Sequence, residues 1–104
     1  MQFTTSILAV ISLAIMATAD LHYSGLCIDN VGGQKVFNDA ATRAACGNYQ
    51  VRNTGSAQWD TCPDCEIVTT GGLTYCHSAA QHIGGDELNH YCTKVNGAGG
   101  SLAD

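Results

Sequence analysis

The sequence predicts a small α+β domain in which two helices pack on one face of an antiparallel sheet. Three observations lead to this fold class. The spacing of apolar residues changes between strand and helix periods, a Gly-Gly turn separates two β-rich runs, and six cysteines fall in a short chain. The expected order is strand, helix, strand, strand, helix, to which the tail can add a strand. This order is typical of a two-layer sandwich, a split β-α-β arrangement that disulfides would staple.

The first half of the chain supplies the first strand and the first helix. Residues 21–28 are apolar and aromatic enough for a strand, and the polar and glycine residues 29–33 predict a turn. Beyond the turn, apolar residues lie three or four apart and alanine dominates, which predicts a helix from Asn38 to about Tyr49. Asn38 or Asp39 can cap this helix, and Gly47 raises the prospect of an early end.

The second half supplies the remaining strands and the second helix. Residues 58–62 are a short candidate strand, and residues 66–69 and 73–77 flank Thr70-Gly71-Gly72 as a β-hairpin. A helix should follow Gly84-Gly85, because apolar residues then recur at helical spacing, at Leu88, Tyr91, Cys92 and Val95. The tail, residues 98–104, either adds an edge strand through residues 101–103 or frays.

The N-terminus reads as a secretory signal. Residues 1–19 contain a short apolar run and end in Ala17-Thr18-Ala19, the small-x-small pattern of a signal-peptidase site. The apolar run is shorter than the roughly 20 residues that span a bilayer. We therefore expect a secreted, extracellular protein whose single cysteine-rich domain comprises residues 20–104.

The six cysteines predict a disulfide framework, because a domain of this size has a marginal core and secretion exposes it to an oxidising route. All six are expected to be paired: Cys27, Cys46, Cys62, Cys65, Cys76 and Cys92. A bridge between Cys62 and Cys65 would close a very small loop and stabilise little, so these two are expected to have different partners. The rest of the connectivity stays open. A zinc site or a redox dithiol at this pair is disfavoured, because no second close pair follows and the context is a turn before a strand.

The charge balance excludes some partners. Four Lys and Arg stand against nine Asp and Glu, for a net charge of −5, and the basic residues form no patch. An acidic chain repels phosphate backbones and anionic lipids. We expect no nucleic-acid partner and no stable membrane insertion.

Signals of chemistry are few. His82, Asp86 and His90 are spaced by four, but Gly84-Gly85 interrupts the helix that would align them on one metal-binding face. We expect no catalytic residue, no metal and no cofactor. Trp59 is either a core residue or an exposed platform for a partner. Together with the acidic Asp60 and Asp64 it forms the candidate binding surface.

Four stretches carry a resemblance to a known group of proteins: Cys-Ile-Asp-Asn at 27–30, the Ala-rich helix over 38–46 with its terminal cysteine, Thr-Cys-Pro-Asp-Cys at 61–65, and Gly-Gly-Asp-Glu at 84–87 leading to Tyr91-Cys92. The chain resembles small secreted cysteine-rich proteins of filamentous fungi. Among these it is similar to effector candidates with the α/β sandwich of the smut-fungus killer toxin alpha subunit.

The resemblance implies a non-enzymatic effector, acting in virulence as a monomer, that binds a host or microbial protein or a cell-wall component. Two alternatives remain: a toxin acting on target-cell membranes, and a cell-wall carbohydrate-binding module using Trp59 with Tyr23, Tyr75 or Tyr91.

Overall fold

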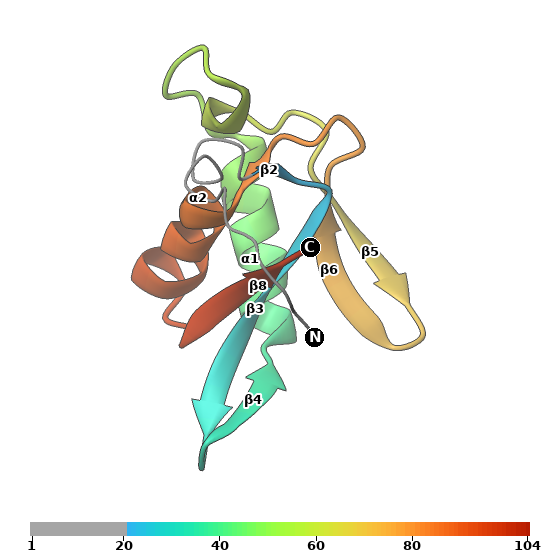
Figure 1. Cartoon of the computed structure of the whole chain (residues 1–104), viewed down its shortest axis with the longest axis vertical. Coiled ribbons are helices and arrows are strands. Elements are labelled where there is room, and N and C mark those ends of the chain that lie inside the picture. Colours follow the sequence, from blue (N-terminus) through green and yellow to red (C-terminus); the bar gives the residue numbers. More distant parts are fainter. Residues whose placement is uncertain (1–20) are drawn as a thin grey trace, which may run out of the picture.

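The computed structural model describes residues 21–104 as a small α+β domain with antiparallel sheets, two helices and three disulfides (Figure 1). The predicted signal segment and its boundary at Asp20 lie outside these residues. The main sheet has the order β4-β3-β6-β5, with β8 also pairing with β3. Its strands are β3 (Ser24–Val31), β4 (Gln34–Phe37), β5 (Glu66–Thr70), β6 (Leu73–His77) and β8 (Gly100–Ala103). A separate two-stranded ladder joins β2 (Leu21–His22) to β7 (Ile83–Gly84).

Strand β3 is the centre of the sheet because it pairs with three others. Its start pairs with β6, its end pairs with β4, and β8 runs antiparallel to it from Gly25 to Ile28. The first predicted strand is therefore confirmed, but it divides at Tyr23 and continues to Val31. The tail of the chain forms strand β8, so the alternative of an edge strand through residues 101–103 is confirmed over a frayed end.

Two hairpins use the same Gly-Gly turn. Gly71 and Gly72 have φ values of 59° and 83° between β5 and β6, and Gly32 and Gly33 have 57° and 82° between β3 and β4. These positive values match the tight turn in which both central residues need φ above zero. The hairpin of β5 and β6 was predicted. The β3–β4 hairpin, which extends away from the helices (Figure 1), was not, since all four residues of β4 are exposed and show no apolar alternation.

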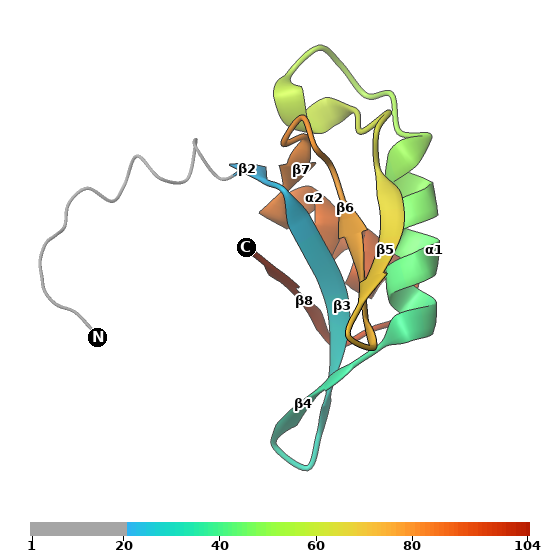
Figure 2. The ribbon, with the colours of Figure 1, turned by 90° about the vertical axis from the view of Figure 1, so that its right-hand side faces the viewer.

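Helix α1 (Asp39–Gln50) confirms the first predicted helix. The side chain of Asn38 caps it by accepting the Ala41 amide at 2.9 Å, and the helix passes through Gly47 without ending. Its buried face is made of small residues and one large ring, namely Ala41, Thr42, Ala45, Cys46 and Tyr49. Figure 2 shows this helix running along one face of the sheet.

The predicted strand over residues 58–62 is wrong. Residues Gln58–Asp60 form a 3₁₀ helix, η2, because the Asp60 carboxylate turns back and accepts the Ala57 amide at 3.0 Å. That bond closes a turn and leaves no extended segment to pair with a neighbour.

The second helix is confirmed, and it begins at Gly85, one residue earlier than predicted. Helix α2 (Gly85–His90) continues directly as a π-helical turn, η3 (Tyr91–Val95). The Asn96 side-chain amide donates to the Tyr91 carbonyl at 2.9 Å, and Gly97 with φ 73° ends the segment. The core lies between α1, α2, η3 and the sheet, and consists of Cys27, Ala41, Ala45, Cys46, Tyr49, Cys62, Cys65, Cys76, Ile83, Leu88, Cys92 and Ala98.

Candidate functional site

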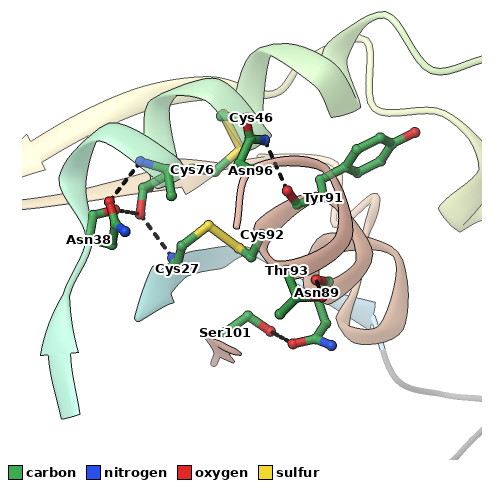
Figure 3. Close-up of a disulfide and its surroundings, with 12 residues drawn as sticks. Cys27, Asn38, Cys46, Cys76, Asn89, Tyr91, Cys92, Thr93, Asn96 and Ser101 are labelled. Atoms are coloured by element: carbon green, nitrogen blue, oxygen red, sulfur yellow. Dashed lines mark hydrogen bonds between the residues drawn. A yellow bond between two sulfur atoms is a disulfide. The ribbon is translucent and has the colours of Figure 1, made fainter. Parts of the chain in front are cut away.

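Two of the three disulfides tie helical segments to the sheet. Cys27 of β3 is bonded to Cys92 of η3, and Cys46 of α1 is bonded to Cys76 of β6 (Figure 3). They span 65 and 30 residues, for which loop-closure entropy gives about 4.3 and about 3.6 kcal/mol of stability. These bridges tie the helices to the sheet at positions far apart in the sequence.

The third disulfide corrects the sequence analysis. Cys62 and Cys65 are bonded to each other, three residues apart, rather than to different partners. The same entropy formula gives this bridge only about 1.6 kcal/mol. A small stabilising effect did not imply that the bond is absent, because the turn over Pro63 and Asp64, closed by the Cys65 amide donating to the Cys62 carbonyl at 3.0 Å, places the two sulfurs within bonding distance.

Asp64 organises the loop beside this bridge. Its carboxylate accepts the Ser78 hydroxyl at 2.7 Å and the Ala80 amide at 2.8 Å. Burial alone would raise the pKa of the Asp64 carboxyl, but these two bonds and the nearby His82 outweigh it, so the pKa lies below its ordinary value. Ser78 in turn accepts the His82 amide at 2.9 Å. Asp64 therefore holds residues 78–82 against the Cys62–Cys65 turn.

Tyr49 joins three segments at the C-terminal end of helix α1. Its ring is fully buried, its hydroxyl donates to the Trp59 carbonyl at 2.7 Å, and the same oxygen accepts the Gly84 amide at 3.1 Å. Burial is the main cause that raises the pKa of Tyr49 to about 12. The neutral phenol is thus the form that the fold requires.

Arg52 lies between two tyrosine rings. Its guanidinium carbon is 5.9 Å from the Tyr49 ring centre and 5.7 Å from that of Tyr91, within cation–π range. One of its nitrogens donates to the Tyr91 hydroxyl at 3.3 Å, and another is 3.9 Å from the Asp60 carboxylate. The positive charge of Arg52 therefore interacts with groups of the fold itself, namely the two tyrosine rings and the Asp60 carboxylate.

The three residues of the predicted binding surface, Trp59, Asp60 and Asp64, have different surroundings in the structure. Trp59 is 37% exposed on η2, so part of its ring faces solvent. Asp60 accepts the Thr54 hydroxyl at 3.0 Å as well as the Ala57 amide, and Asp64 is engaged with Ser78 and Ala80. The two carboxylates serve the loops around them, and Trp59 is the member of the set that stays available.

A different surface emerges on the sheet face turned away from the core. Residues alternate along β3, so Cys27 points to the helices while Leu26 points away from them. Leu26 pairs with Leu102 of β8, and these two line an apolar cavity of about 240 Å³ together with Leu73 and Tyr75 of β6.

The same open side continues onto the β3–β4 hairpin. Phe37 is opposite Ile28 in the ladder, which places its 59% exposed ring on the side of the sheet that carries Leu26. Leu102 is 42% exposed. We call Leu26, Phe37, Leu73, Tyr75 and Leu102 the open apolar face. Sequence reasoning missed it because β4 was not recognised, and the residues come to one side through the pairing of β3 with β4, β6 and β8.

Within residues 21–104, no helix has both the length and the apolar character needed to cross a bilayer.

Comparison with known proteins gives one match. A family model described as biotrophy-associated secreted protein 4 (BAS4) matches residues 20–101, which is most of the chain. No curated protein and no solved structure matches it. The shared sandwich of the killer toxin alpha subunit therefore stays an expectation from the sequence.

Proposed function

The chain belongs to the biotrophy-associated secreted protein 4 (BAS4) family of fungal secreted cysteine-rich proteins, and we propose that it is an effector that binds a host protein without catalysing a reaction. Biotrophy is growth on living tissue, so a secreted protein of this family meets its target in a living host. Catalysis is not part of the proposal, since the polar side chains around Asp64, Tyr49 and Arg52 are engaged in holding loops together.

The observation that carries the proposal is the open apolar face. Phe37 and Leu102 are exposed beside a largely apolar cavity, and an exposed apolar patch of this kind suits the buried centre of a protein interface. The disulfides at Cys27 and Cys76 hold strands β3 and β6 of this face against the helices before binding, which lowers the conformational entropy lost on association. A stapled scaffold with an apolar face fits recognition of a macromolecule.

The experiment compares matched variants of the oxidised protein. Phe37→Asp and Leu102→Asp each place a charge on the open apolar face, while Val51→Asp places the same charge on a side chain that is 79% exposed at the end of helix α1. We expect host-protein capture from leaf extract to fall by at least about tenfold for the first two variants and to persist for the third. Equal capture by all three variants would contradict the proposed surface.

A second candidate, binding of cell-wall carbohydrate, is favoured by the exposure of Trp59. Retention of the protein on chitin or glucan, lost in Trp59→Ala, would support it over the host-protein target. The membrane-toxin alternative has the net charge of −5 against it. Electrolyte leakage from fungal cells treated with the oxidised protein would support that alternative, and leakage from neither fungal cells nor leaf discs would oppose it.

A further inference from the structure

Two of the disulfides adjoin each other in the core. The sulfur atoms of Cys46, Cys65 and Cys76 all lie within 4.8 Å of one another, so the sulfur of Cys65 is close to both sulfurs of the Cys46–Cys76 bridge. Among the described residues, Cys62 is not a member of this group. The two sulfurs of the Cys62–Cys65 bridge therefore have different surroundings.

Cys46 and Cys65, one cysteine from each of these two bridges, border a cavity. Cys46 and Cys65 are each 2% exposed, whereas the other four cysteines are fully buried. A cavity of about 200 Å³ lies beside them, lined by Cys46 and Cys65 and, among charged and polar groups, by Arg43, Gln50 and Glu66. The Cys62–Cys65 bridge also spans the shortest loop, so the folded state resists its opening least.

Asp64 makes the two sulfurs of this bridge unequal after reduction. Its Oδ1 atom lies 3.8 Å from the sulfur of Cys62. In the disulfide that sulfur has no proton, but as a thiol it can donate one to the carboxylate. A negative charge on Cys62 is disfavoured beside the carboxylate, so the thiolate forms preferentially on Cys65.

We propose that the Cys62–Cys65 bridge is a thiol–disulfide exchange site that passes reduction on to the Cys46–Cys76 bridge. In the first step an external dithiol reduces Cys62–Cys65: the dithiol is oxidised to its own disulfide, and two electrons and two protons pass to Cys62 and Cys65. In the second step the Cys65 thiolate attacks the sulfur of Cys46 or Cys76. A new bond to Cys65 forms, the Cys46–Cys76 bond breaks, and the displaced cysteine leaves as a thiolate, with no net electron transfer.

The exchange has a defined structural consequence. It removes the bond between helix α1 and strand β6 while Cys27–Cys92 still ties η3 to β3. The protein would thus loosen on one side when it moves from an oxidising to a reducing compartment. This inference is independent of the proposed host target.

A matched pair of variants tests the geometry. Cys62→Ser and Cys65→Ser abolish the same bridge, but the first leaves a free thiol at Cys65 and the second leaves one at Cys62. Both are purified without reductant, alkylated in the folded state and mapped by peptide mass spectrometry under non-reducing conditions. We expect alkylation at Cys46 and Cys76 to be at least about tenfold higher in Cys62→Ser than in Cys65→Ser. Alkylation only at Cys65 in the first variant would overturn the proposal.

The unmodified protein provides a second test that does not depend on the folding of variants. Limiting dithiothreitol is added anaerobically, and the products are trapped by alkylation at intervals. The expected early product has Cys62 alkylated together with Cys46 or Cys76, and a bridge from Cys65 to the remaining cysteine. A persistent early product alkylated at Cys62 and Cys65, with Cys46–Cys76 intact, would contradict the relay, as would opening of Cys27–Cys92 first.

Discussion

The hydroxyl of Tyr49 donates a 2.7 Å hydrogen bond to the carbonyl of Trp59, ten residues along the chain. The same hydroxyl accepts the Gly84 amide. One buried oxygen of helix α1 is therefore the hydrogen-bond partner of a carbonyl in η2 and of an amide at the junction of β7 and α2. A backbone polar group buried without a partner costs free energy, which makes Tyr49 the residue that fixes the loops on this side of the domain.

Tyr49→Phe should therefore destabilise the domain by about 1–3 kcal/mol, because it leaves the Trp59 carbonyl and the Gly84 amide without this partner. The measurement is urea unfolding of the oxidised protein followed by circular dichroism. Tyr75→Phe is the matched control, since the Tyr75 hydroxyl meets the Thr70 hydroxyl at 3.2 Å on an exposed surface. Similar losses in the two variants would contradict the role of Tyr49.

The loss of folding free energy at alkaline pH should also depend on Tyr49. The folded-state pKa of Tyr49 is about 12 against an ordinary value of 10.0, so the folded protein retains a proton that the unfolded chain releases. The stabilising contribution is complete below pH 10 and is lost as the pH rises through 12. The loss is up to about 3 kcal/mol at 1.36 kcal/mol per pH unit. Urea unfolding between pH 9 and 12 should show this slope in the parent protein and a flatter one in Tyr49→Phe; parallel slopes would refute the assignment.

Asp64→Asn should destabilise the domain by about 1–3 kcal/mol, because hydrogen bonds from Ser78 and Ala80 to a charged acceptor become bonds to a neutral one. Since the pKa of Asp64 is lowered in the folded state, its contribution is present above pH 3.8 and is lost as the pH falls through the folded-state pKa. Thermal melts from pH 7 to pH 2 should converge for the parent and the variant.

Asp39→Asn is the control for that series. Asp39 is exposed and pairs with Arg43 at 3.0 Å, a surface contact that should change stability by less than about 1 kcal/mol. An effect as large as that of Asp64→Asn would show that charge alone, not the Asp64 contacts, determines the acid limb.

The predictable parts of the fold were those set by neighbours in sequence. Helix α1 follows from the alanine spacing and its Asn38 cap, and the β5–β6 hairpin follows from Gly71-Gly72. Strand β4 was missed although Gly32-Gly33 gives the same turn, because its four exposed residues form half of a ladder only when β3 is beside them.

The candidate site was less predictable, because it depends on contacts between distant residues. The open apolar face needs Leu26 and Leu102 in register, 76 residues apart (102 − 26). Nor does composition show which sulfurs meet. Loop-closure entropy determines how much a bridge stabilises, whereas the pairing of Cys62 with Cys65 depends on the local turn, so the expectation of different partners was wrong.

The disulfides that close longer loops should contribute more to the free energy of unfolding. Replacing both Cys62 and Cys65 with Ser should cost about 1.6 kcal/mol, and replacing both Cys27 and Cys92 should cost about 4.3 kcal/mol. Complete reduction of the parent should unfold the domain near room temperature, since its core is small. Thermal melts of the three samples check this order, and a cooperative melt after complete reduction would contradict it.

Two glycines allow a test of packing with opposite signs. A Cβ on Gly25 would come within 2.3 Å of Leu88 Cδ2 and 3.2 Å of the Leu102 carbonyl oxygen, and Leu88 is packed in the core at 1% exposure. Gly25→Ala should destabilise the domain by about 1–3 kcal/mol.

A Cβ on Gly47, inside helix α1, would meet nothing within 4 Å. Gly47→Ala should stabilise the domain by about 0.5–1 kcal/mol, because alanine loses less backbone entropy in a helix. Urea unfolding of both variants measures the two effects side by side. A neutral Gly25→Ala would mean that Leu88 can repack and that β3 and α2 are not held as closely as the contact indicates.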